Sequence, residues 1–85
     1  MRGRLDLVVI ARMIEILYVE GAMKRTQLQM ASRLNYKTFT RYLNWLTERG
    51  LIDVDSENGY VKLTRSGLET YQTLVAWTRR YLEKI

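Results

Sequence analysis

Residues 34–52 read LNYKTFTRYLNWLTERGLI, a pattern that predicts one amphipathic helix, a stop and the start of a strand. Asn35 suits the N-cap because its side-chain oxygen can accept a hydrogen bond from a free amide of the first turn. Gly50 suits the C-terminal end, since glycine adopts the left-handed backbone found there without strain. The helix is therefore expected from Tyr36 to about Arg49, with an inner stripe of Tyr36, Phe39, Leu43 and Leu46.

The opposite side of this expected helix is polar and presents Lys37, Thr38, Thr40, Arg41 and Asn44. It belongs to a longer stretch, residues 21–47, that has no acid and five cations: Lys24, Arg25, Arg33, Lys37 and Arg41. Ordinary exposed faces mix both signs of charge, so a cation-only stretch favours an anionic partner over a merely solvated face. Trp45 fits core packing, a subunit contact or a DNA contact.

Two helices are expected before this one. The first runs from about Leu5 to Glu20 and ends at Gly21, with apolar residues at helical spacing: Leu7, Ile10, Met13, Ile14 and Leu17. The second is shorter and runs from about Lys24 to Arg33.

Beyond Gly50 the apolar residues alternate with polar ones, as in strands. Asn58-Gly59 separates two such runs and is a strong hairpin signal, which predicts a two-stranded ribbon. Thr64 is then expected to cap a last helix that runs from Arg65 to the C-terminus.

Three helices followed by a hairpin is the order of a winged helix-turn-helix, in which the third helix enters the major groove of DNA. The fold class expected is thus mainly α with a small β-hairpin and a long C-terminal helix, with residues 1–64 forming the DNA-binding part and residues 65–85 a dimerisation helix of the same unit. On the wing, Lys62 and Arg65 are candidate DNA contacts, whereas Asp53, Asp55 and Glu57 would be repelled by phosphate. We therefore expect a wing that contacts DNA weakly or from its base, or that is purely structural.

The last helix carries apolar residues at coiled-coil spacing, in the row Leu68, Tyr71, Val75, Thr78, Leu82 and Ile85. Beside it lies a second row of Leu74, Trp77 and Tyr81. One row can cover the domain while the other meets a second subunit. A chain of 85 residues buries a modest core, so association would add stability.

Several classes of function are disfavoured. The chain has no cysteine and no histidine, which excludes disulfides, metal sites built on those residues, and Ser-His-Asp or Cys-His catalysis. An enzyme is not expected, nor is a cofactor or small-molecule ligand, because no Gly-rich phosphate loop or other cofactor motif is present. The apolar segments are too short and too often interrupted by charge to span a bilayer, and no signal pattern follows Met1, so a cytoplasmic protein is expected.

The sequence also resembles a known family. The resemblance rests on Leu34-Asn35-Tyr36-Lys37, Tyr42-Leu43, Leu46 to Ile52, Tyr60 to Thr64, and Gly67. These residues are similar to those of archaeal winged-helix proteins typified by a ten-kilodalton, chromatin-associated DNA-binding protein, and the likeness extends from about the first helix to the last.

The resemblance implies a nucleoid-associated homodimer joined through antiparallel C-terminal helices, with the third helix of each subunit offered to DNA. Its DNA-facing positions fall on Lys37, Thr38, Thr40, Arg41 and Asn44, and its dimer positions on Leu74, Val75, Thr78, Tyr81, Leu82 and Ile85. The function expected is therefore a double-stranded DNA-binding protein, either a transcriptional regulator or a nucleoid protein. The alternative is a protein-interaction module that uses the same fold without DNA.

Overall fold

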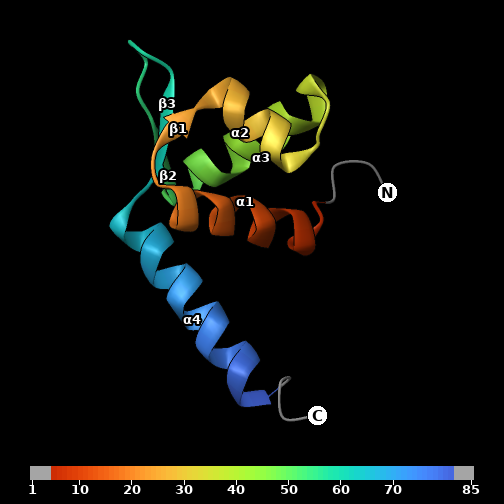
Figure 1. The fold of residues 1–85 in the computed structure, drawn as a ribbon, viewed down its shortest axis with the longest axis vertical. Helices are drawn as coiled ribbons and strands as arrows, with labels where there is room; N and C mark the ends of the chain where they lie inside the picture. The colour runs from red at the N-terminus through yellow and green to blue at the C-terminus, as the bar shows by residue number, and fades with distance from the viewer. Residues whose placement is uncertain (1–4, 82–85) are drawn as a thin grey trace.

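The computed structural model describes residues 5–81, and for residues 78, 79 and 81 it describes the backbone alone. The described residues form four helices and one small antiparallel sheet, in the order α1 (Leu7–Glu20), β1 (Met23–Lys24), α2 (Arg25–Ser32), α3 (Tyr36–Glu48), β2 (Ile52–Val54), β3 (Tyr60–Leu63) and α4 (Arg65–Tyr81). In Figure 1, α1, α2 and α3 gather into one body with the sheet at its side, and α4 leaves that body beyond β3.

The ends of α1 and α3 follow from their capping residues. The backbone N–H of Val8 donates to Asp6 Oδ1 at 2.8 Å, and that of Thr38 donates to Asn35 Oδ1 at 2.8 Å. Gly21 and Gly50 follow the two helices with φ values of 81° and 74°, in the left-handed region that glycine tolerates. The predicted extents of both helices are confirmed to within two residues.

The core lies where α1, α2, α3 and the sheet meet. It consists of side chains that are less than a tenth exposed: Ile10, Met13, Ile14, Leu17, Leu28, Phe39, Tyr42, Leu43, Leu46, Ile52 and Val61. Burial of this one face of α3 fixes which side of the helix is turned outward. Trp45 packs against the core at its margin, and the guanidinium of Arg49 lies 4.6 Å from its ring centroid.

Two residues expected in the core lie outside it. Leu7 is 76% exposed and Tyr36 is 67% exposed, so their assignment to the inner stripes was wrong. Each is the first residue of its helix. Side chains lean toward the N-terminal end of a helix, so a residue in the first turn extends past the helix end instead of over the body. In α3, Tyr42 completes the buried stripe.

The sheet has three strands where two were expected. β3 is central and pairs with β2 on one side and with β1 on the other, with Met23 opposite Val61 and Lys24 opposite Tyr60. Lys24 therefore lies in a strand and not in the second helix, which begins at Arg25. A strand of two residues is too short to show an alternating pattern, which is why the sequence does not reveal it.

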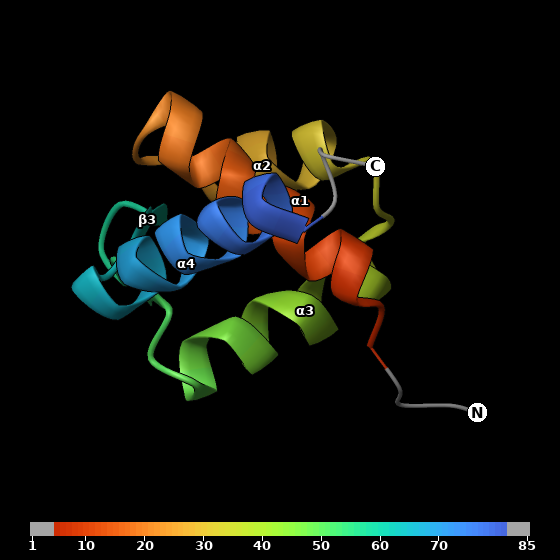
Figure 2. The same ribbon diagram turned by 90° about the horizontal axis from the view of Figure 1, so that it is seen from below.

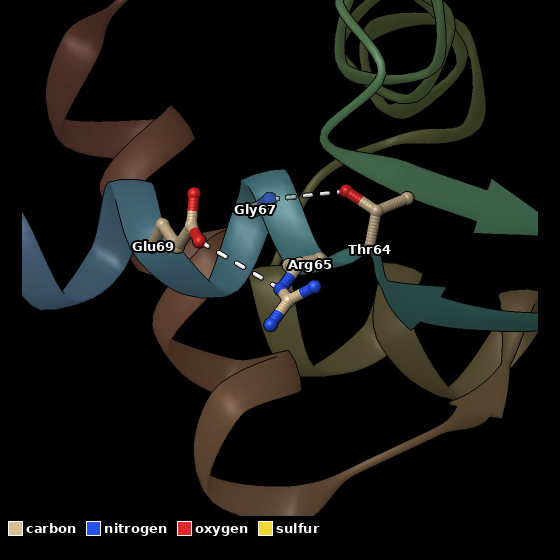
Figure 3. A network of polar contacts seen from close by, with 4 residues as sticks. All are labelled: Thr64, Arg65, Gly67 and Glu69. Atoms are coloured by element: carbon tan, nitrogen blue, oxygen red, sulfur yellow. Dashed lines mark hydrogen bonds and ion pairs between the residues drawn. The ribbon is translucent and has the colours of Figure 1, made fainter.

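The start of α4 is fixed by Thr64, as predicted. Its hydroxyl oxygen accepts a hydrogen bond from the backbone N–H of Gly67 at 3.0 Å (Figure 3) and its hydroxyl donates to the carbonyl oxygen of Gly50 at 2.6 Å. α4 contacts α1, and there the rings of Tyr71 and Tyr18 stack with centroids 4.3 Å apart. Figure 2 shows the two helices from below, with α4 in front of α1. Part of the predicted apolar row on α4 thus covers α1. The expected continuation of the helix to residue 85 lies outside the described residues.

One hydrogen bond ties the first helix to the third. The hydroxyl of Tyr42 accepts from the backbone N–H of Asp6 at 2.8 Å, across a partly buried junction. Replacing Tyr42 by Phe keeps the ring and removes this acceptor, so we expect the free energy of unfolding to fall by about 1 kcal/mol. Urea denaturation followed by tryptophan fluorescence measures the change. Tyr60→Phe, at an exposed wing position, is the control, and an equal loss in both variants would contradict the assigned role of the hydroxyl.

Candidate nucleic-acid interface

The outward side of α3 is a polar stripe opposite a buried one. Lys37, Arg41 and Asn44 are exposed and recur at intervals of four and three residues, so they lie on one face of the helix. Phe39, Tyr42, Leu43 and Leu46 hold the other face in the core. This stripe of Lys37, Arg41 and Asn44, called here the α3 stripe, is brought together as the sequence predicts.

Thr38 and Thr40 flank the α3 stripe and are half-buried. The hydroxyl of Thr40 donates to the carbonyl oxygen of Tyr36 at 2.9 Å, so its hydrogen is already used within the helix. The backbone N–H of Thr38 is used by the Asn35 cap. These two residues therefore border the stripe and are less accessible than its three members.

The α3 stripe ends in a carboxylate. Glu48 is exposed, lies one turn after Asn44 and shares the outward face of the helix. It would repel phosphate, which restricts an anionic partner to the N-terminal part of α3. The same part carries the positive end of the helix dipole.

The other three cations of the acid-free stretch 21–47 lie at the two ends of α2. Arg33 is exposed and follows α2 directly, close in the chain to Lys37, and it has φ 59°, an uncommon left-handed conformation for a residue with a Cβ. Lys24 and Arg25 are exposed at the other end, about 10 Å away along an eight-residue helix. There Lys24 pairs with Tyr60, and the backbone N–H of Arg25 donates to the carbonyl oxygen of Gly59 at 2.9 Å. Lys24 and Arg25 thus belong with the wing and Arg33 with α3.

The wing, which consists of β2, β3 and the turn between them, is acidic, because Asp53, Asp55 and Glu57 outnumber Lys62. Lys62 is exposed on β3 but lies directly opposite Asp53 of β2, so the two charges offset each other. Both residues line a shallow hollow with Val54, Asp55 and Tyr60. At the base of the wing, Arg65 Nε lies 3.8 Å from Glu69 Oε2, as Figure 3 shows, and both side chains are largely exposed. Such a pair is worth well under 1 kcal/mol, but it places an acid beside the cation.

The predicted dimer positions are partly described. Leu74 is 45% exposed and Val75 is half-buried on α4, and Trp77, beside them in the second row, is 53% exposed. The backbone of Thr78 and Tyr81 continues the helix, whereas Leu82 and Ile85 lie outside the described residues.

Residues 5–81 lack two further features, a membrane-spanning helix and a metal-binding cluster. That part of the chain has no helix long and apolar enough to cross a membrane. Nor does it gather three or more acidic, cysteine or histidine side chains into a group that could hold a metal ion.

Comparison with known proteins identifies the architecture. Residues 2–82 match the family model described as "Winged helix-turn-helix". No curated protein matches the chain in a sequence comparison.

Solved structures share the fold. One is the PcaV transcriptional regulator from Streptomyces coelicolor in complex with its natural ligand, with a TM-score of 0.72 and 22% identity over 92% of this chain and 58% of the regulator. Another is a MarR family transcriptional regulator from Silicibacter pomeroyi DSS, with a TM-score of 0.72 and 18% identity over 89% of this chain and 54% of the other. The chain therefore spans little more than half the length of either protein, and at these identities the likeness shows the fold.

Proposed function

Because the chain belongs to the winged helix-turn-helix family, we propose that it is a non-enzymatic protein that binds double-stranded DNA and regulates transcription. The observation that carries the proposal is the α3 stripe: two cations and an amide, exposed and free of acids until Glu48, on a helix whose other face is locked in the core. Two structural neighbours are transcriptional regulators, which supports this proposal.

In the proposed complex the N-terminal part of α3 enters the major groove, which is about 12 Å wide and admits one helix. Lys37 and Arg41 neutralise phosphates, and Asn44 supplies an amide that can pair with a base edge. Arg33 adds a charge just before α3, while Lys24 and Arg25 add charge beside the wing. Two separate contacts along the duplex would result, one from α3 and one from the edge of the sheet.

A titration of a random-sequence duplex, followed by fluorescence anisotropy at several salt concentrations, tests this function. Binding at micromolar concentrations or tighter in low salt, with a steep fall as salt rises, is expected because phosphate neutralisation releases counterions. Sequencing of the DNA that the protein retains from a pool of randomised duplexes separates two roles. Enrichment of particular sequences would indicate a regulator, and uniform recovery a DNA-packing role in the nucleoid. Absence of binding in low salt would contradict the proposal and favour the alternative, a protein-interaction module that uses the same fold without DNA.

Within the wing, Lys62 is proposed as a minor contact because Asp53 faces it. For each subunit bound, we expect Lys62→Ala to weaken binding only about twofold, against roughly eightfold at 0.1 M salt for the loss of one full phosphate contact in Lys37→Ala. Anisotropy titrations of the two variants on the same duplex make the comparison. Equal losses would show that the wing binds phosphate as strongly as α3 does.

We also propose a homodimer formed through α4. Support comes from the apolar rows on this helix, whose described members include the exposed Leu74 and the half-buried Val75. Two such helices, one from each copy, would place two α3 stripes on one duplex.

The dimer is tested with Leu74→Asp, which puts a charge into the proposed interface. Analytical sedimentation is expected to report a dimer for the wild type and a monomer for this variant, since an unpaired charge in an apolar contact costs several kcal/mol. Ala76→Asp is the matched control, because Ala76 is exposed on roughly the opposite side of α4 from Leu74. A monomeric wild type at high concentration would end the proposal.

A further inference from the structure

The most exposed aromatic side chain of the described residues lies next to the α3 stripe. Tyr36 is 67% exposed, precedes Lys37 and is one helical turn before Thr40. An isolated apolar side chain on a surface needs no explanation. Tyr36 differs because it occupies the first turn of the helix that the proposed function places in the major groove.

Two polar side chains near Tyr36 already form hydrogen bonds within the protein. Its carbonyl oxygen accepts the hydroxyl of Thr40, and the side-chain oxygen of Asn35 accepts the Thr38 amide. Because the hydroxyl hydrogen of Thr40 is used in this way, its methyl group is the part of the side chain that can make an apolar contact. The Tyr36 and Thr40 side of α3 is therefore an apolar flank beside a cationic one.

In the major groove, the one apolar group on the edges of the base pairs is the 5-methyl group of thymine. A side chain that contacts it distinguishes thymine from cytosine without any hydrogen bond. We propose that Tyr36, with the Thr40 methyl beside it, is a specificity-determining residue that contacts thymine methyl groups. The proposal rests on the proposed DNA binding and extends it from affinity to sequence preference.

The experiment removes the methyl group and leaves the rest of the duplex unchanged. Two duplexes of the same A·T-rich sequence, one with thymidine and one with deoxyuridine, are titrated with the wild-type chain by anisotropy. Burial of one methyl group is worth about 0.8 kcal/mol, so the thymidine duplex is expected to bind roughly fourfold more tightly for each methyl contacted. The converse pair, a G·C-rich duplex with cytosine or 5-methylcytosine, is expected to gain by the same factor.

Variants assign the effect to Tyr36. Tyr36→Ala is expected to bind both A·T-rich duplexes equally, at the weaker level, and to keep the wild-type salt dependence. Tyr36→Phe keeps the ring and is expected to keep the discrimination. Because Tyr36 is exposed, both variants should unfold at the wild-type denaturant concentration, which confirms that the fold is intact.

The outcomes separate this inference from the function on which it rests. Equal wild-type affinity for the thymidine and deoxyuridine duplexes overturns the methyl contact and leaves DNA binding in place. Discrimination that survives in Tyr36→Ala overturns the assignment to this residue. No salt-dependent binding to either duplex overturns the proposed function and this inference together.

Discussion

Replacing both Lys37 and Arg41 by alanine is expected to weaken DNA binding roughly 60-fold at 0.1 M salt for each subunit bound, because each subunit loses two phosphate contacts. The slope of log affinity against log salt is expected to become shallower by about 1.8 per subunit. Alanine favours helix, and both side chains are exposed, so the fold should be unaffected. Anisotropy titrations between 50 and 300 mM salt measure both quantities.

The control for this variant removes the same charge elsewhere. Arg12 and Arg80 are exposed on α1 and α4, and their joint replacement by alanine lowers the net charge as much as the test variant does. Only a small loss is expected, from the long-range field alone. Equal losses in the two double variants would show that overall charge, and not the α3 stripe, binds DNA.

The largest loss of stability is expected from Gly67→Ala. Gly67 is buried in the first turn of α4, and a Cβ there would overlap the carbonyl oxygen of Leu51, which also accepts the Thr64 amide at 3.0 Å. Alanine gains up to about 1 kcal/mol in helix propensity, but the overlap is with backbone, which cannot rotate aside. We expect a net loss of about 2 kcal/mol or more in the free energy of unfolding, as for other overpacked sites.

Urea denaturation measures this loss, with Ser66→Ala as the control at an exposed position of the same turn. Ser66→Ala should leave stability within about 0.5 kcal/mol of the wild type. A Gly67→Ala protein as stable as the wild type would mean that α4 and the segment before β2 are not in close contact. Because α4 is also the proposed dimer helix, sedimentation of the same variant would show whether its displacement disturbs assembly.

Most of the fold could be predicted because its helices are marked by local chemistry. The side chains of Asn35 and Thr64 accept the backbone N–H hydrogen bonds that their N-cap positions predict. Gly21 and Gly50 have positive φ values, a backbone conformation that glycine adopts more easily than other residues. These signals depend on neighbouring residues alone. The α3 stripe follows in turn, since the buried face of a helix determines its outward face.

The errors arise where local pattern carries no information. Leu7 and Tyr36 fit the apolar spacing, but their exposure depends on where each helix begins relative to the body. β1 exists because β3 offers it an edge, and its partners Val61 and Tyr60 are far away in the chain. The separation of Lys24 and Arg25 from Arg33 also depends on this pairing, because it places the first two residues beside the sheet. Tyr36 as a candidate contact was missed because an apolar residue at helical spacing was assigned to the core.

The pairing of β1 with β3 has a consequence for the proposed complex with DNA. Because Met23 lies opposite Val61, this pairing closes a loop of chain that contains both α2 and α3. α3 and the hairpin are thus expected to open and close as one cooperative unit, without a hinge between them. In the proposed complex, a mismatch in curvature between protein and DNA would then be relieved by bending or untwisting the double helix, whose stiffness varies with sequence. Flexible pyrimidine–purine steps between the two proposed contacts would therefore favour binding without being touched.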